Sequence, residues 1–237
     1  MLQTGTVEER TFELLKELMQ EPLLASTKLV GGTSLALQIG HRKSTDLDLF
    51  TTEIPNIQEI SEVLFNKYAY TPVIQTEKTT IGYIDGIKID VIYHPYKWLR
   101  TTEISKNIRL ASVEDIAAMK LHAIANSGER PKDFVDIAFL SQKYSYDTIK
   151  SLALEKYPMY DPIMIDRAII YFDDVNKEAI NDIKMIGYEM DWERIKRRIV
   201  RMTDKPEHVF LNPPLEKQIS LTNTIRASSR KKTGPHL

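Results

Sequence analysis

The 237-residue chain contains no cysteine, only nine glycines and no long apolar run. Without cysteine it can form neither a disulfide framework nor a thiolate metal site, and it has no Cys nucleophile. Because no apolar segment approaches the roughly 18–20 residues that a transmembrane helix needs, we expect no membrane association. The first ten residues lack a basic start followed by an apolar core, so we expect no signal peptide and a cytoplasmic location.

The chain also has no excess of charge of either sign. It contains 32 Lys and Arg and 33 Asp and Glu, which give a net charge of −1. This balance excludes a generally basic nucleic-acid-binding surface, although it allows a local basic patch. With 42% hydrophobic residues, the chain can bury a sizeable core as one large domain or two modest ones.

Hydrophobic periodicity divides the chain into three parts. Residues 1–100 mix helical and strand patterns, residues 101–205 are mainly helical, and residues 206–237 form a Pro-containing basic tail that we expect to be flexible. We therefore predict an α+β fold, in which a mixed β-sheet flanked by helices is followed by a helical C-terminal half. The predicted strands are 28–30, 46–50, 71–76, 79–84 and 87–93, and the predicted helices are 7–20, 33–39, 57–68, 112–124, 132–143, 149–156, 162–172 and 192–202.

Two glycine-containing turns punctuate the first part. Gly31-Gly32 follows a short apolar run and is typical of a tight turn, after which Thr33 or Ser34 can cap the next helix. Asp85-Gly86 separates two strand patterns and predicts a two-residue hairpin.

Three aspartates carry the chemical signal. Asp46 and Asp48 are two residues apart on a predicted strand, so their carboxylates point to the same side, and Asp90 interrupts another, apolar strand. Mg²⁺ is bound through one or two carboxylates plus substrate phosphates, and a Gly-Gly turn at a helix N-terminus suits a phosphate. Each feature alone has a purely structural explanation, as a turn, solvated acids or a salt-bridged acid. Their joint occurrence predicts a site for a metal–nucleoside triphosphate complex.

These motifs resemble a known superfamily. Gly31-Gly-Thr-Ser34, the run Arg42…Ser44-x-Asp46-x-Asp48 and the Asp90 strand look like the DNA polymerase β-like nucleotidyltransferases. The later residues Ser112-x-x-Asp115, Lys120-x-x-Ala123 and Arg130-x-Lys132-Asp133-x-x-Asp136 are similar to the AbiEii/AbiGii toxin family within it. The resemblance covers roughly residues 25–145.

The resemblance implies roles for particular residues. Asp46 and Asp48 would hold two Mg²⁺ ions, with Asp90 as the third carboxylate, which orients or deprotonates the acceptor hydroxyl. Most nucleotide-binding residues would come from the first motif, with Gly32, Thr33 and Ser44 on the triphosphate. The full set is Gly31, Gly32, Thr33, Ser34, Arg42 and Ser44, together with Asp133 of the later motif.

The helical half would complete the site. Lys120 would reach the phosphates, and Asp133 or Asp136 would add a further carboxylate. Both aspartates share one helix face. We favour Asp136, because it lies deeper within the apolar pattern of its helix.

The function implied by the resemblance is Mg²⁺-dependent transfer of NMP from an NTP to a hydroxyl acceptor. It would make the chain the toxin of a type IV or abortive-infection toxin–antitoxin system, with a cognate antitoxin as partner and tRNA or another RNA as acceptor. Two alternatives stay open: a protein-modifying (AMPylating) enzyme or an antitoxin, and a non-catalytic NTP-binding module.

Other polar and aromatic residues have simpler interpretations. The histidines His41, His94 and His122 are not at metal-ligand spacing, so we interpret them as structural or surface residues. Tyr96 and Trp98 are expected to pack the two halves together. The basic stripe within 192–202 is either a solvated helix face or an RNA-binding surface.

Overall fold

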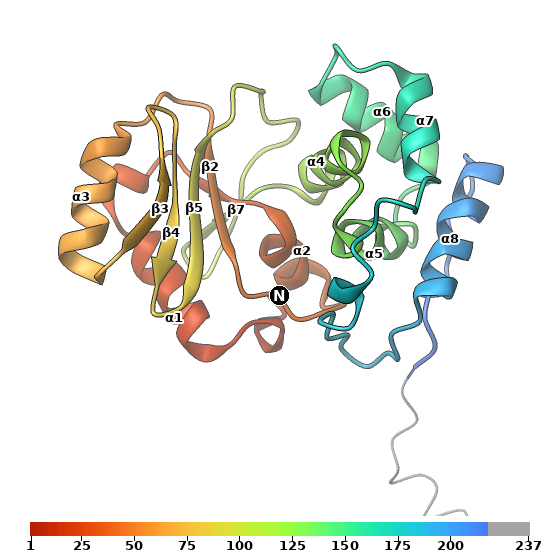
Figure 1. Cartoon of the computed structure of the whole chain (residues 1–237), viewed down its shortest axis with the longest axis horizontal. Coiled ribbons are helices and arrows are strands. Elements are labelled where there is room, and N and C mark those ends of the chain that lie inside the picture. Colours follow the sequence, from red (N-terminus) through yellow and green to blue (C-terminus); the bar gives the residue numbers. More distant parts are fainter. Residues whose placement is uncertain (218–237) are drawn as a thin grey trace, which may run out of the picture.

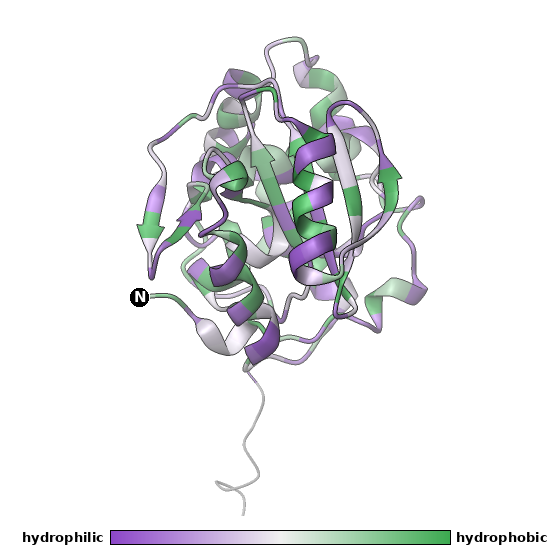
Figure 2. Cartoon of the chain, turned by 90° about the vertical axis from the view of Figure 1, so that its left-hand side faces the viewer, coloured by the Kyte–Doolittle hydropathy of each residue, from purple (hydrophilic) through white to green (hydrophobic). Residues whose placement is uncertain are grey.

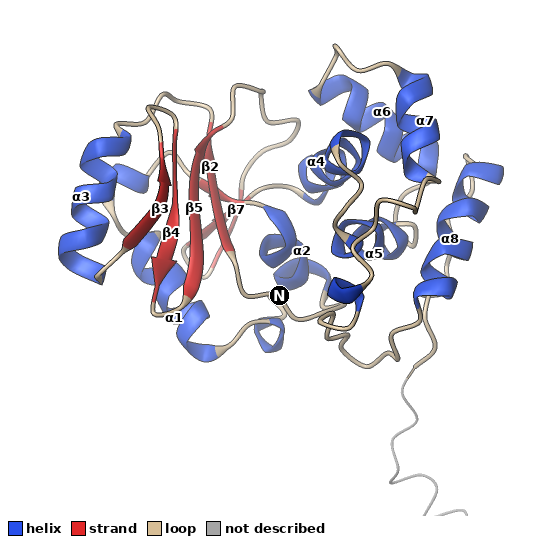
Figure 3. Ribbon diagram, in the orientation of Figure 1, coloured by secondary structure: helices blue, strands red, loops and turns tan. Residues whose placement is uncertain are grey.

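The computed structural model describes residues 1–217, and Figure 1 shows them as two lobes. Figure 3 shows that the strands gather in one lobe and the helices of the second half in the other. Among residues 1–217, no helix combines the length and the apolar character that a membrane span requires. The order of the elements confirms the predicted α+β arrangement, in which a mixed sheet is followed by helices.

The sheet lobe is built on seven strands in the order β3-β4-β5-β2-β1-β7-β6. The pairs β2–β5 and β1–β7 are parallel, and the other neighbours are antiparallel. The strand bounds are β1 (Lys28–Leu29), β2 (Leu47–Thr51), β3 (Thr71–Gln75), β4 (Thr79–Ile84), β5 (Ile87–Tyr93), β6 (Glu103–Ser105) and β7 (Ile108–Leu110).

Three helices belong to the sheet half and five to the second half. The first three are α1 (Glu9–Leu18), α2 (Gly31–Ile39) and α3 (Ile57–Tyr68). The others are α4 (Val113–Asn126), α5 (Pro131–Leu140), α6 (Tyr146–Lys156), α7 (Pro162–Ile169) and α8 (Trp192–Asp204). Seen from the α3 side, hydrophobic and hydrophilic residues alternate along the ribbon, as expected for elements with one buried face (Figure 2).

Two hydrophobic cores result. One lies between the sheet and helices α1 and α3, and the other lies among α4–α8. Helix α2 belongs to both, because Leu35 packs into the helical core and Leu37 into the sheet core. The same helix packs against α4 and α5. It therefore joins the two lobes by buried apolar contacts on both sides.

Residue 100, where we expected the α/β half to end, does not coincide with the edge of the sheet. Strands β6 and β7 follow it, and Ala111 N donates to Leu29 O just beyond β7. Arg109 fastens this edge, because its guanidinium donates to the carbonyls of Thr27, Met19 and Leu24 at 2.8–2.9 Å. Strands of three residues are too short to show an alternating pattern, which explains why periodicity missed them.

The segment after residue 205 is also not all loose. Phe210 and Leu215 are buried, and Phe210 N donates to Ser141 O at 2.9 Å. The guanidinium of Arg198 lies over the Phe210 ring at 4.6 Å. Up to residue 217 the predicted tail is thus packed on α5 and α8, whereas its remainder, residues 218–237, lies outside the described residues.

A buried ion pair ties the connection between β5 and β6 to the helical lobe. Lys156 Nζ donates to Asp115 Oδ1 at 2.9 Å and to Lys97 O at 3.0 Å, and neither charged side chain is exposed. Asp115 also accepts from the backbone amides of Leu99 and Arg100. Trp98 lies between the lobes, with Lys156 Nζ at 4.7 Å from its ring.

Removing one partner of this pair leaves a buried charge uncompensated. We expect Lys156→Ala to lower the free energy of unfolding by about 3–5 kcal/mol, measured by chemical denaturation. Lys150 on the same helix pairs with the half-exposed Asp166, so Lys150→Ala is the matched control and should cost less than about 1 kcal/mol. Equal effects of the two substitutions would contradict the assignment.

Candidate active site

One wall of a cavity of about 540 Å³ carries the three predicted aspartates, with Asp46 just before β2, Asp48 on β2 and Asp90 on β5. The residues of β2 alternate, so that Leu47 and Leu49 are buried in the sheet core while Asp48 and Phe50 face the cavity. Asp48 stands beside Asp90 in the parallel β2–β5 register. Neighbouring strands are roughly 4.8 Å apart, so the two carboxylates are close like charges.

The two carboxylates are neutralised unequally. Lys88 Nζ lies 2.7 Å and 2.6 Å from the two carboxylate oxygens of Asp90. Burial alone would lower the pKa of Lys88, but its contact with Asp90 and the charge of Asp48 raise it. Burial and the nearby charge of Asp90 raise the pKa of Asp48 to about 6. On this wall, the Asp90 carboxylate is therefore neutralised by Lys88, whereas the Asp48 carboxylate is repelled by the neighbouring Asp90 charge.

Gly31 and Gly32 form the first turn of α2 instead of the separate turn that we predicted. Val30 N donates to Asp48 O at 2.9 Å, which brings the start of the helix against β2. Gly31 has φ +66°, and a Cβ there would overlap the Asp48 carboxylate. A Cβ at Gly32 would overlap the Arg42 guanidinium. Glycine is required at both positions because other groups of the site occupy the space of a side chain.

Thr33 and Ser34 have structural roles and do not line the cavity. Both are buried, and neither caps α2. Thr33 Oγ1 donates to Asp46 O and lies 2.9 Å from Ser44 Oγ, whose hydroxyl can donate to it. The helix begins two residues earlier than expected, so Thr33 lies inside it and does not precede it. Its hydroxyl therefore contacts the 44–46 segment and holds it in position. Among the residues of this motif, Gly31, Gly32, Arg42 and Ser44 do line the cavity.

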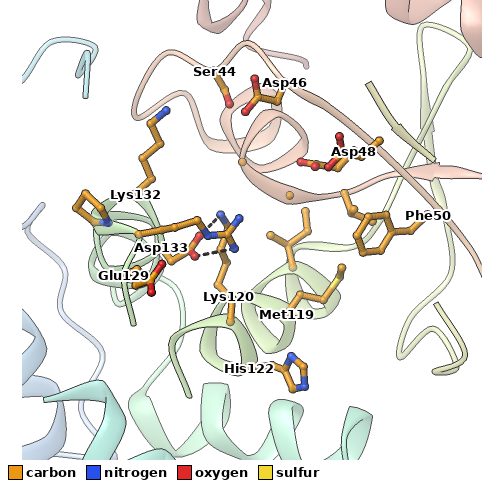
Figure 4. Close-up of a pocket in the computed structure, with 18 of the residues that line it drawn as sticks. Ser44, Asp46, Asp48, Phe50, Met119, Lys120, His122, Glu129, Lys132 and Asp133 are labelled. Atoms are coloured by element: carbon orange, nitrogen blue, oxygen red, sulfur yellow. Dashed lines mark hydrogen bonds and ion pairs between the residues drawn. The ribbon is translucent and has the colours of Figure 1, made fainter. Parts of the chain in front are cut away.

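The opposite wall comes from α4 and α5. Lys120 Nζ lies 2.6 Å from Asp133 Oδ1 and 2.7 Å from Asp136 Oδ2. Burial alone would lower the pKa of Lys120, but the two carboxylates outweigh it and raise this pKa. Lys120 is therefore a buried cation at the cavity surface. Figure 4 shows Lys120, Asp133 and Lys132 across the cavity from Asp46 and Asp48.

The two aspartates of α5 differ in their position. Asp133 lines the cavity and also contacts Arg130, with Nη2 and Oδ2 2.9 Å apart. Asp136, which we favoured from the sequence, lies beneath the cavity with no exposed surface. It accepts from Arg42 Nε at 2.6 Å and Arg42 Nη2 at 2.9 Å, and His41 Nε2 lies 2.8 Å away. An apolar pattern marks depth in the core, and here the deeper residue holds its neighbours in position.

The charged side chains of this wall carry a net positive charge. Burial alone would raise the pKa of Asp136, but Arg42 and Lys120 outweigh it and hold this pKa well below its usual range. Arg42, Lys120 and Arg130 are three cations against the carboxylates of Asp133 and Asp136. A polyanion entering the cavity would meet this excess opposite the three aspartates.

Several cavity residues were not predicted from the sequence, and two of them, His94 and His122, line the cavity although we interpreted them as structural or surface residues. The residues not predicted are Phe50, Lys88, His94, Met119, His122 and Tyr157. The two histidines lack metal-ligand spacing and are far apart in the chain, so no local pattern joins them. Lys88 could have been predicted from the sequence. It precedes Asp90 by two residues and must therefore share its strand face.

The donor chemistry of the carboxylate wall fits Mg²⁺. Within residues 1–217 no three acidic, His or Cys side chains form a ready-made metal centre. Mg²⁺, however, is usually bound by one or two carboxylates, with waters and substrate phosphates as its other ligands. The Lys88 ammonium on Asp90 shows that a cation is accommodated at this position.

Comparison with known proteins identifies the family. A family model described as the nucleotidyl transferase AbiEii toxin, type IV TA system, matches residues 13–217. The chain belongs to this family. The resemblance noted in the motifs is thereby confirmed, and the chain is a nucleotidyltransferase. A toxin family of this type implies an NTP substrate and a cognate antitoxin.

Relatives of this AbiEii-family chain agree in fold. The uncharacterized protein aq_aa25 of Aquifex aeolicus (strain VF5) is 33% identical over 193 residues, which span 79% of this chain and 93% of that protein. The structure of JHP933 from Helicobacter pylori covers 95% of this chain and 100% of its own, with a TM-score of 0.54 and 16% identity. A second H. pylori structure, described as a candidate nucleotidyltransferase, covers 84% and 96%, with a TM-score of 0.51 and 18% identity. These structures share the fold.

Gly31 provides a test of the packing between α2 and β2. Gly31 and Gly86 both have positive φ, but only Gly31 has a neighbour where a Cβ would stand. Alanine at positive φ costs roughly 1–2 kcal/mol at either position. Overpacking against Asp48 should add about 1–3 kcal/mol for Gly31→Ala and abolish nucleotidyl transfer.

Gly86→Ala is thus the matched control, and it should keep full activity. Denaturation curves and an activity assay measure the two effects. An active Gly31→Ala variant with the stability of Gly86→Ala would show that the close approach of Gly31 to Asp48 is unimportant.

The raised pKa of Asp48 predicts a gain in stability when its charge is removed. A carboxyl whose pKa is about 6 in the folded state and 3.8 in the reference state destabilises the fold as the pH rises from 4 to 6. Asp48→Asn should therefore raise the free energy of unfolding by about 1–3 kcal/mol at pH 7.5 without metal. The gain should shrink as the pH falls toward 4.

Denaturation in the presence of a chelator at several pH values measures this gain. Asp174→Asn, at an exposed aspartate, is the control and should change little. A destabilised Asp48→Asn variant at pH 7.5 would contradict the repulsion between Asp48 and Asp90.

Proposed function

We propose that this chain transfers NMP from an NTP, bound with Mg²⁺, to a hydroxyl group of an RNA acceptor such as tRNA, and that it acts as the toxin of its toxin–antitoxin pair. One observation carries the proposal. Three carboxylates face a cluster of cations across a single cavity, with a glycine-rich helix start between them. This arrangement suits in-line displacement at a phosphorus atom, which needs charge stabilisation and no nucleophilic side chain.

The triphosphate would bind at the polar end of the cavity. The first turn of α2 presents Gly31 and Gly32 at the cavity surface, where backbone N–H groups and the helix dipole favour an anion. Ser44 adds a hydroxyl group. Lys120 and its arginine neighbours supply the positive charge that opposes the phosphates.

The carboxylate wall would hold the metal. Asp48 and Asp90 are its best-placed ligands, with the exposed Asp46 at the rim. When bound, Mg²⁺ neutralises charge on the phosphates and favours the ionised form of the attacking oxygen.

Asp90 is also placed to take the proton of the acceptor hydroxyl. As that proton passes to the Asp90 carboxylate, the acceptor oxygen bonds to the α-phosphorus. The bond from the α-phosphorus to its bridging oxygen breaks, and pyrophosphate leaves with the electron pair. Lys120, held by Asp133 and Asp136, faces the region where this charge develops.

The RNA acceptor is proposed from the family resemblance of the sequence motifs, and the basic stripe of α8 does not support it. Arg198 in that stripe is buried and donates to Ser141 Oγ and to backbone carbonyls. Arg194 contacts Asp191, and Lys196 contacts Glu193. These three cations are engaged within the protein, and Arg201 lies over the Phe210 ring, which favours the structural interpretation for most of the stripe, while Arg197 is exposed.

A labelling experiment tests the proposed reaction. The purified chain is incubated with Mg²⁺, total tRNA and one α-labelled NTP at a time, and the products are separated on a denaturing gel. We expect label on RNA that is sensitive to ribonuclease. Asp46→Asn and Asp48→Asn should reduce labelling by about 100-fold or more, the loss typical when a group that stabilises transition-state charge is removed.

Asp174→Asn is the control for these variants and should label RNA as the wild type does. The same three variants should differ in growth arrest on induced expression, with only Asp174→Asn remaining toxic. Label on a protein band would favour the AMPylating alternative, and NTP binding with no transfer to any acceptor would favour the non-catalytic module. Full activity of both active-site variants would refute the mechanism.

A further inference from the structure

The cavity has an aromatic end that the proposed chemistry does not use. It is lined by Phe50 after Asp48, His94 after β5, His122 on α4 and Tyr157 after α6. The rings of His122 and Tyr157 are stacked, with centroids 3.8 Å apart and planes 21° apart. His94 contacts Phe50, with ring centroids 5.4 Å apart. Figure 4 shows Phe50 and His122 on the side of the cavity away from Lys132 and Asp133.

Hydrogen bonds hold these rings in place. Tyr157 Oη lies 3.2 Å from His94 Nε2, which joins the two sides of the aromatic end. Asn126 Nδ2 lies 3.1 Å from His122 Nδ1, and Tyr160 Oη donates to Asn126 Oδ1. The rings therefore form a fixed surface built from both lobes.

The order of residues along β2 places this surface relative to the reacting groups. Asp48 and Phe50 follow one another on one face of β2, roughly 6.6 Å apart, and Asp46 lies just before the strand. The polar end with Ser44 lies before Asp48, and the aromatic end lies after it. An NTP whose α-phosphate is at Asp48 and whose outer phosphates are at the polar end must extend its nucleoside toward the rings.

The charge at this end suits an uncharged planar group. Burial and the charge of Lys156 lower the pKa of His94 to about 4, and burial also lowers the pKa of His122. Both imidazoles are therefore neutral near pH 7. The cations suited to phosphate are on the opposite side, on α4 and α5.

We propose that His94 and His122, held in place by Tyr157, form the subsite that binds the nucleobase of the incoming NTP by stacking. The inference rests on the proposed function and adds to it a place for the base. It assigns two histidines, which sequence spacing gave no reason to join, to substrate recognition.

A comparison of two ligands tests the subsite. Binding to the full-length protein in Mg²⁺ is measured by calorimetry, with α,β-methylene analogues of the four NTPs and with inorganic tripolyphosphate. His122→Ala should weaken the tightest-binding analogue by about 5- to 150-fold, the range of base–aromatic stacking. It should leave the affinity for tripolyphosphate unchanged, which also shows that the variant is folded.

Three further variants sharpen the comparison. His122→Phe keeps a planar ring and should restore most of the affinity. His94→Ala should show the same selective loss as His122→Ala. His208→Ala, at an exposed histidine outside the cavity, is the matched control and should bind both ligands as the wild type does.

Unchanged analogue binding by both alanine variants would overturn the subsite. Equal loss of tripolyphosphate would also overturn it, because the effect would then be structural. Unchanged analogue binding with a raised KM for the acceptor would assign the rings to the acceptor instead. A wild-type chain that binds neither ligand would refute the proposed function itself.

Discussion

The site depends on the contacts of one buried carboxylate, that of Asp136. Fully buried on α5, it contacts Lys120 of α4, Arg42 and His41. Removing the Arg42 or the Lys120 contact would leave charge uncompensated in the interior, where an unpaired ion is costly. The position of Lys120 at the cavity surface and the path of the chain after α2 therefore follow from one side chain that touches neither the cavity nor its contents.

The sheet contributes a different constraint, because it places two carboxylates close enough to repel each other. Parallel pairing of β2 with β5 sets Asp48 beside Asp90, and α2 closes over Asp48 at Gly31. The cost is limited by Lys88, which neutralises only one of the two. The repulsion at Asp48 thus lowers the stability of the fold at the cavity surface, while the strands beneath keep their apolar core.

The sequence predicted the elements that carry a regular pattern. Strands β4 and β5 and helix α3 begin and end where expected, and Asp85-Gly86 forms the hairpin with positive φ at both residues. Strands β6 and β7 were missed because three residues show no period. Motifs indicated the carboxylates, but they could not separate Asp133 from Asp136, since residues three apart share a helix face. The aromatic end was invisible, because His94, His122 and Tyr157 meet only in the tertiary structure.

Helix α2 has a mechanical consequence for the whole molecule. It places Leu35 in one core and Leu37 in the other, and burial of a leucine is worth roughly 2 kcal/mol. A hinge motion between the lobes would pull one of these leucines out of its core, so the packing of α2 opposes such a motion. The distance between the two walls of the cavity is then set by the packing of α2, whereas the stretch between α4 and α5, which lines the cavity with Glu129 and Arg130, is exposed.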